Sequence, residues 1–474
     1  MVGCPVVSDD VRKSLTPAIE AAIAAAEAAW PQTLERLKEL VHIPSCSFSG
    51  FDPVHVVASA NNTADWLRAS GFPDVEVLPG GGPHPAVIAS DRRAGASAPT
   101  LLLYAHHDVQ PPLREELWTS PPFEPTERGG RLYARGAADD KAGIMVHCAS
   151  AAAWRASHGK LPINLVAVIE GEEEIGSPNF SAFLRTHRDR LRADALVIAD
   201  AANYAAGMPS LTTSLRGNVV VEVELSALKS PLHSGLWGGA VPDVTAALAR
   251  MLGALTNADG SIALPELLTD VRPMTAAERA DLARLPYTPK WFADVTGLLD
   301  PTLAPADSVT AHTAIWRRPA LTISAMQAGQ RGKTGNVIMD SAWARVSVRI
   351  VPDQDPLRVQ AALVAHFEQR CPQGMRVRCD ARDPGSAWAT DTDHPIFAAA
   401  RAALHRGYGV APVAIGCGAS IPFVGEMSKL LGGVPALLTA VEDPICGAHA
   451  ENESLLLADA LSALRSEVAL FGLV

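Results

Sequence analysis

The chain of 474 residues lacks the features that mark several large classes of protein. It has no uninterrupted apolar run of about 18 residues, so we expect no membrane-spanning helix. It begins without a basic segment followed by an apolar core, so we expect no secretory signal. Lysine and arginine number 40 against 51 aspartates and glutamates, and no basic run occurs. This balance argues against nucleic acid or an anionic membrane as a partner.

Cysteine is scarce and irregularly placed. The number is odd and no CxxC pair occurs among the seven positions, which are Cys4, Cys46, Cys148, Cys371, Cys379, Cys417 and Cys446. A disulfide scaffold and a cysteine-ligated zinc site both need paired spacing, so neither is expected. Reduced thiols in a cytoplasmic protein are the prediction.

Several short catalytic motifs are also absent. The Gly332-Lys333-Thr334 segment would need a glycine where Gln327 stands to form a phosphate-binding loop. Neither HExxH nor GxSxG occurs, which excludes the thermolysin type of zinc peptidase and the hydrolase serine elbow.

Two textures of hydrophobic pattern divide the chain. From about 75 to 200, short apolar runs alternate with helical stretches, and the clearest helix follows Asp139-Asp140. A helix over 15–41, interrupted near Pro31, precedes them. Continuous apolar strands that alternate with helices are typical of a mostly parallel α/β sheet.

The pattern changes after Arg216. Residues 218–227 alternate polar and apolar, as a half-buried antiparallel strand does, and a helix, a long irregular stretch over 256–318 and further strands follow. We therefore predict an α/β catalytic domain with an inserted α+β lid or dimerisation domain. The expected boundaries are 1–215 and 389–474 for the catalytic domain and 216–388 for the insertion.

Histidine and carboxylate residues close the predicted strands. His106 and Asp108 end one strand, Glu172–Glu174 end another, and Asp200 ends a third, while Asp139 opens a helix. In open α/β sheets, ligands bind beyond the carboxyl ends of the strands. Carboxylates gathered there repel one another unless a cation neutralises them.

Each of these groups taken alone also has a purely structural explanation. A glutamate triplet is usually a solvated turn, and Asp139 or Asp140 could simply cap a helix. The conjunction is less ordinary, because burying such groups at three strand ends without a partner is costly. It favours a metal site.

The motifs around these residues resemble a known family. YAHHDVQPP (104–112), LYARGAADDKAG (132–143), EGEEEIGS (170–177), LHSGLWGG (232–239) and GAHAENE (447–453) occur in order. Together they resemble the carnosinase and PepV-type branch of the aminoacylase–carboxypeptidase G metallopeptidases. The resemblance covers about residues 85–455.

The resemblance implies two divalent metal ions per chain, zinc first, with manganese or cobalt as alternatives. It places one ion on His106, Asp139 and Asp200 and the other on Asp139, Glu174 and His449. Glu173 is implied to be the general base, and Asp108 to orient a ligand or that base.

The family also implies how substrate is held. Arg349 resembles an arginine that pairs with the substrate carboxylate, and Gly418 and Ser420 resemble a loop that binds the same group. His233 resembles a histidine that serves the active site of a neighbouring subunit, which implies a homodimer. Arg349 could instead be a surface charge on a strand, and the Gly418 loop could be an ordinary glycine-rich turn.

The leading hypothesis is a cytoplasmic dinuclear-metal dipeptidase that acts on small peptides. An N-acyl-amino-acid amidohydrolase or a carboxypeptidase of the same family is the alternative. A catalytically silent binding protein on the same fold is a further possibility, against which the intact set of metal residues argues.

Overall fold

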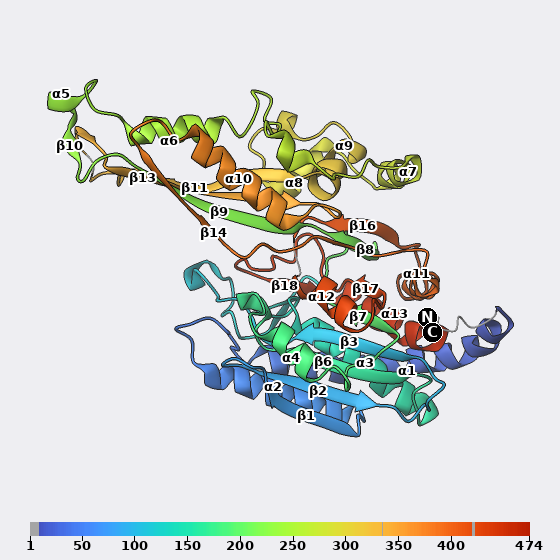
Figure 1. Ribbon diagram of the computed structural model, residues 1–474. Coiled ribbons are helices and arrows are strands. Elements are labelled where there is room, and N and C mark those ends of the chain that lie inside the picture. The colour runs from blue at the N-terminus through green and yellow to red at the C-terminus, as the bar shows by residue number, and fades with distance from the viewer. Residues whose placement is uncertain (1–8, 334, 420–421) are drawn as a thin grey trace. The chain divides into compact units, whose positions relative to one another are not determined.

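The computed structural model describes residues 9–333, 335–419 and 422–474 and divides the chain into two compact units. The first contains the residues up to Thr213, Thr390–Ile415 and Phe423–Val474, and the second contains Ser214–Ala389 and Gly416–Pro422. In Figure 1 the first unit runs from blue to green and resumes in red, and the second runs from green to orange. The chain thus leaves the first unit and returns to it.

A sheet with a parallel centre forms the middle of the first unit. The parallel strands are, in spatial order, β6 (Asn164–Glu170), β3 (Thr100–His106), β7 (Ala195–Ile198) and β17 (Ala436–Thr439). Antiparallel strands flank them: β1 (Asp74–Pro79) and β2 (Pro85–Asp91) beside β6, and β8 (Ser210–Leu215) beside β17. The mostly parallel sheet predicted from the apolar runs is confirmed.

Helices bury both faces of this sheet. Leu101, Leu103 and Ala105 of β3 join one large core, which is covered by the helices α1 (Asp9–Val41), α3 (Lys141–His158) and α13 (Leu457–Leu473). On the other face, the Tyr104 ring packs on Phe180 of α4 (Phe180–Thr186) and on Phe423 of α12 (Pro422–Leu430). Burial on both sides explains why the strand sequences are continuously apolar.

The helices begin and end where their sequences place capping residues. The Asp140 side chain accepts from the backbone N–H of Gly143 and caps the start of α3, and Gly159, with φ of +69°, caps its end after His158. The buried Asp91 of β2 accepts from Arg155 of α3 at 2.5 Å and from Arg93 at 2.7 Å. Burial alone would raise the pKa of Asp91, but these hydrogen bonds outweigh it and lower that pKa to about 2.

The first helix differs from its prediction. α1 runs without a break through Pro31, which lies on its exposed side, while Leu34, Leu37 and Leu40 are buried. Proline removes one backbone hydrogen bond, but the buried stripe on both sides of Pro31 holds the helix to the core. The remaining elements of this unit are α2 (Pro53–Ala69), η1 (Glu115–Leu117), β4 (Thr126–Arg128), β5 (Arg131–Tyr133), η2 (Glu173–Ile175), α11 (Pro395–Tyr408) and β18 (Ser454–Leu456).

The second unit is built on an antiparallel sheet. Its strand order is β11 (Ala320–Gln327), β13 (Ser341–Ile350), β9 (Gly217–Ser226) and β14 (Arg376–Ala381). Alternate residues of β13 are buried against α6 (Val244–Gly253) and α10 (Pro356–Arg370). The alternating pattern predicted for 218–227 follows from this single covered face.

The stretch over 256–318 is more ordered than its sequence predicts. It contains η3 (Pro265–Leu268), α7 (Ala276–Arg284), α8 (Pro289–Thr296), η4 (Pro301–Leu303), α9 (Ser308–His312) and η5 (Thr313–Arg317). Thr275 and Glu278 form a capping box at the start of α7. The remaining short elements of the chain lie outside this stretch. They are β10 (Leu232–His233), α5 (Ser234–Trp237), β12 (Val337–Ile338), β15 (Trp388–Ala389) and β16 (Val413–Cys417).

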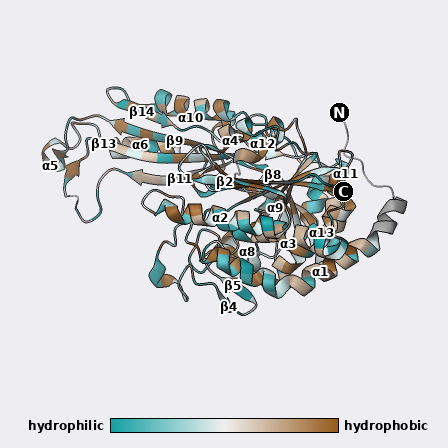
Figure 2. Cartoon of the chain, turned by 90° about the horizontal axis from the view of Figure 1, so that it is seen from below, coloured by the Kyte–Doolittle hydropathy of each residue, from teal (hydrophilic) through white to brown (hydrophobic). Residues whose placement is uncertain are grey.

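Hydropathy along the helices agrees with their packing. Figure 2 shows hydrophilic and hydrophobic residues interleaved along the helices, as expected where one side faces a core and the other faces solvent. Among the residues that the structure describes, no helix combines the length and the hydrophobicity that crossing a lipid bilayer requires.

Candidate metal centre

The parallel strands of the first unit deliver polar side chains to one edge of its sheet. His106 is the last residue of β3, Glu173 and Glu174 lie in the turn after β6, and Asp200 follows the end of β7. Parallel strands end at the same edge, so residues far apart in sequence meet there. Asp139 comes from the loop before α3.

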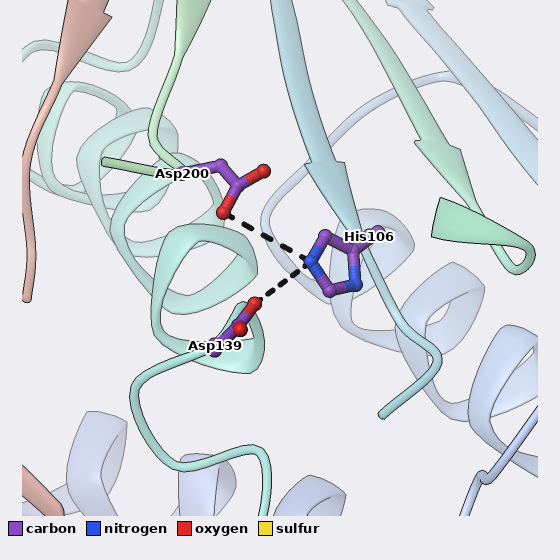
Figure 3. Close-up of side chains that lie close together, drawn as sticks. All are labelled: His106, Asp139 and Asp200. Carbon is purple, nitrogen blue, oxygen red and sulfur yellow. Dashed lines mark hydrogen bonds and ion pairs between the residues drawn. The ribbon is translucent and has the colours of Figure 1, made fainter. Parts of the chain in front are cut away.

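His106, Asp139 and Asp200 form one group of possible metal ligands. The Nε2 atom of His106 lies 3.0 Å from Oδ1 of Asp139 and 3.9 Å from Oδ1 of Asp200. Figure 3 shows the two carboxylates converging on this nitrogen. One ligand atom from each of the three residues falls within 4.8 Å of the others.

Asp139, Glu174 and His449 form a second group. The Nε2 atom of His449 lies 3.0 Å from Oδ2 of Asp139 and 3.2 Å from Oε2 of Glu174. One ligand atom from each residue again lies within 4.8 Å of the others. Asp139 belongs to both groups, and a different one of its carboxylate oxygens faces the histidine of each.

Asp108 orients the first of these histidines. Its backbone oxygen lies 3.1 Å from Nδ1 of His106, and its carboxylate oxygen Oδ1 lies 3.4 Å from the same nitrogen. A proton on Nδ1 therefore has an acceptor, and Nε2 stays available as a ligand atom. The Asp108 carboxylate also accepts from the backbone N–H groups of Glu173 and Glu174.

Two residues that the sequence analysis did not name complete the surroundings of the ligands. Ser47 donates its hydroxyl to Asp108 at 2.7 Å. Gln110 donates its side-chain amide to Oε2 of Glu174 at 2.7 Å and its backbone N–H to Oε1 at 3.0 Å. The sequence feature that could have pointed to Gln110 is its position two residues after Asp108, in the segment that leaves β3.

The buried carboxylates of this cluster would be stabilised by a cation. Burial and the neighbouring carboxylate of Asp140 raise the pKa of Asp200 well above its usual range. Hydrogen bonds that His449 makes with the acceptor carboxylates of Asp139 and Glu174 raise the pKa of His449 to about 10, which favours a proton on the ring beside these negative charges. A divalent ion can replace such protons. Two imidazoles and three carboxylates are ligands suited to zinc, manganese or cobalt, so the residues present fit metal.

Glu173 belongs to neither ligand group. Burial raises the pKa of Glu173 to about 7, and the carboxylates of Glu174, Asp139 and Asp108 act in the same direction. A carboxylate with a pKa near neutrality can both accept and release a proton at physiological pH.

His107 lies beside the cluster but turns away from it. Its Nε2 atom lies 3.0 Å from the backbone oxygen of Pro85, and its ring packs so closely on Gly171 that a Cβ there would lie 2.6 Å from His107 Cε1. Burial lowers the pKa of His107 to about 4, which keeps the ring neutral.

The remaining predicted site residues belong to the second unit. His233 is exposed at the start of α5 and accepts from the backbone N–H of Gly235. Arg216 donates to the backbone oxygen of Gly418 at 3.1 Å, and burial followed by the positive charge of Arg349 lowers the pKa of Arg216. Gly418 and Arg349 are thus both neighbours of Arg216. Ser420 lies outside the described residues.

The sequence pattern of one protein family matches most of the chain. The match covers residues 102–471, and the family is described as Peptidase family M20/M25/M40. All five residues of the two ligand groups lie inside the matched range.

Similar proteins include several dipeptidases. The chain is 30% identical over 381 residues to the cysteinylglycine-S-conjugate dipeptidase of Corynebacterium striatum, which covers 78% of this chain and 81% of that protein. It is 28% identical over 392 residues to human β-Ala-His dipeptidase, covering 81% and 76%. The solved structure of the dipeptidase Dug1p of Saccharomyces cerevisiae superposes with a TM-score of 0.81 at 26% identity, covering 96% of this chain and 98% of that one.

Proposed function

The chain belongs to Peptidase family M20/M25/M40 and is a metal-dependent dipeptidase, and we propose that it holds two divalent ions bridged by Asp139. One observation carries this proposal: the two oxygens of Asp139 face the histidines of two different ligand groups. His106 and Asp200 would complete one site, and Glu174 and His449 the other. Zinc suits this mixture of imidazole and carboxylate, and manganese or cobalt would also be accepted.

Glu173 is the proposed general base. When bound, the ions would polarise the scissile carbonyl and lower the pKa of the attacking water. Glu173 takes the proton of that water and delivers it to the nitrogen of the departing amine, so it serves as base and then as acid. Asp108 keeps Nδ1 of His106 protonated and anchors the backbone from which Glu173 projects.

A panel of substrates tests this function. The metal-reconstituted protein should be assayed on dipeptides, tripeptides and N-acetyl amino acids, with zinc and with manganese. A dipeptidase gives its highest kcat/KM on dipeptides. A preference for N-acetyl amino acids would favour the amidohydrolase alternative, and a preference for longer peptides would favour a carboxypeptidase. If no substrate of the panel is hydrolysed, the result would contradict a dipeptidase and favour a catalytically silent binding protein.

Arg349 is the proposed anchor for the free carboxylate of the substrate, together with Gly418 and Ser420. Arg349→Met is expected to raise KM for dipeptides about tenfold or more, because a charged hydrogen-bonding partner is lost. KM for the corresponding dipeptide amides, which lack the terminal charge, should hardly change. Arg345→Met, four positions away on the same face of β13, is the matched control. Equal losses on both substrates would mean that Arg349 is structural.

A homodimer is proposed, in which His233 of each chain serves the metal centre of the other. His233 is followed by the exposed side chains of Leu236 and Trp237, which are 74% and 50% exposed and suit an interface. His233→Ala chains and Glu173→Gln chains should each be inactive, and mixing them should restore part of the activity. Exchange of subunits without any rescue, or an active monomer in light scattering, would exclude this role.

A cytoplasmic location is also proposed. The six described cysteines are free thiols, which suits a reducing compartment. Fractionation of the producing cells tests this, and recovery of the protein outside the cytoplasm would contradict it.

A further inference from the structure

Glu453 is a buried carboxylate that no step of the proposed reaction uses. It is 0% exposed. Its Oε2 atom accepts from Nη1 of Arg135 at 2.6 Å and from the backbone N–H of Gly136 at 2.8 Å. Its Oε1 atom accepts from the backbone N–H groups of Ala138 at 2.9 Å and Asp139 at 3.1 Å. Both oxygens are thus engaged by the loop that presents Asp139.

The same contact reaches the segment that carries the second histidine. Glu453 lies four residues after His449, and its backbone oxygen accepts from the N–H of Ala134 at 3.1 Å. Arg135 also donates to the backbone oxygen of Ala450 at 3.0 Å. Glu453 and Arg135 therefore join the loop that leads to Asp139 to the segment that follows His449.

Neither of these segments is held by regular secondary structure. Gly136 has φ of +80°, and a Cβ there would lie 2.5 Å from Val109 Cγ1, so the loop approaches its surroundings closely. His449 itself has φ of +62°, a left-handed conformation that non-glycine residues adopt at a cost. Contacts from outside must hold both segments in place.

We propose that Glu453 is a positioning residue that fixes the distance between Asp139 and His449 before any metal binds. This inference rests on the proposed two-ion centre. Because Asp139 belongs to both ligand groups, a displacement of its loop weakens both sites together. A displacement of the His449 turn alone would weaken only one.

The chemistry of the contact requires a carboxylate. All four groups that face Glu453 are donors, so both of its side-chain oxygens must accept. A glutamine has the same shape, but its NH₂ group would face two N–H donors and leave them without an acceptor. Burying the charge is tolerable because Arg135 pairs with it.

The test compares Glu453→Gln with Glu451→Gln. Glu451 stands two residues earlier in the same segment and pairs with the exposed Arg114, so it is a matched control. Zinc affinities of metal-stripped proteins should be measured by chelator competition, and the cobalt-loaded proteins compared by visible absorption. Glu453→Gln is expected to lower the affinity for both ions by about 10- to 100-fold and to alter the cobalt spectrum, because a residue that supports the ligands is lost. Glu451→Gln should match the wild type in both.

Two ions bound by Glu453→Gln with wild-type affinity and spectrum would overturn the proposal, as would weakening of one ion only. If Glu453→Gln does not fold, Glu453→Asp, which keeps the charge on a shorter side chain, takes its place under the same criteria. Failure of both to fold would make Glu453 a residue of the fold alone and would also overturn it. The wild-type protein keeps the two questions apart: if it binds two ions and cleaves dipeptides, the proposed function stands whatever Glu453 does.

Discussion

Glu173→Gln is expected to keep both metal ions and to lose turnover by about 10²-fold or more, the usual contribution of a general base. Glu173 lies outside both ligand groups, so its amide should leave the affinity for metal unchanged. An amide has no proton-accepting carboxylate, so the water would lose its base and the leaving amine its acid. The measurements are kcat on a dipeptide and metal content by elemental analysis.

Glu172→Gln is the matched control for this variant. Glu172 is the preceding residue, and its side chain accepts from the backbone N–H of His84 and from the amide of Asn179, away from the ligand groups. The kcat of Glu172→Gln should stay within about threefold of the wild type, because Glu172 takes no part in the proton transfer assigned to the general base. Full activity of Glu173→Gln with normal metal content would show that another group takes the proton.

Asp139→Asn, unlike Glu173→Gln, is expected to lower the affinity for metal strongly. The amide replaces one of the two oxygens that face the ligand histidines, and it removes the negative charge that both ions would share. Both sites should weaken together, by more than the roughly 10- to 100-fold seen when a group behind a ligand is lost. Turnover should fall with the metal content, which elemental analysis after dialysis measures.

Asp200→Asn separates a shared ligand from an unshared one. Asp200 belongs to one group only, so its variant should lose one ion and retain the other. If Asp139→Asn also retained one ion at wild-type affinity, the carboxylate would not bridge.

The sequence predicted the sheet and the edge at which the site forms because both follow from local patterns. Continuous apolar runs such as 100–106 indicate strands buried on both faces, and such strands are parallel in α/β folds. The rule that ligands gather beyond their carboxyl ends then pointed to His106, the glutamates at 172–174 and Asp200, and the family resemblance singled out Glu174 among the glutamates. His449 follows no such strand, so its place beside Asp139 could be expected only from the family resemblance.

Other features depend on tertiary contacts that no local pattern contains. Pro31 was predicted to interrupt the first helix, but the helix continues, because packing of Leu34 and Leu37 holds its second half to the core. The short helices within 256–318 were missed although Thr275 and Glu278 form a capping box, since segments of this length show too few turns for a periodic pattern.

The partners of the ligands were also beyond the sequence. Ser47 reaches Asp108 from 61 positions away, and Glu453 reaches Asp139 from 314. Such pairs become visible only when the chain is folded, because the two residues of each pair lie far apart in sequence.

Titration of the metal-stripped protein with zinc, with bound metal and dipeptide hydrolysis followed in the same samples, tests most directly whether Asp139 bridges two ions that act together on a dipeptide. Two equivalents should bind per chain, and activity should reach its plateau only as the second equivalent fills. Full hydrolysis at one equivalent, with no second ion bound, would contradict the bridged pair.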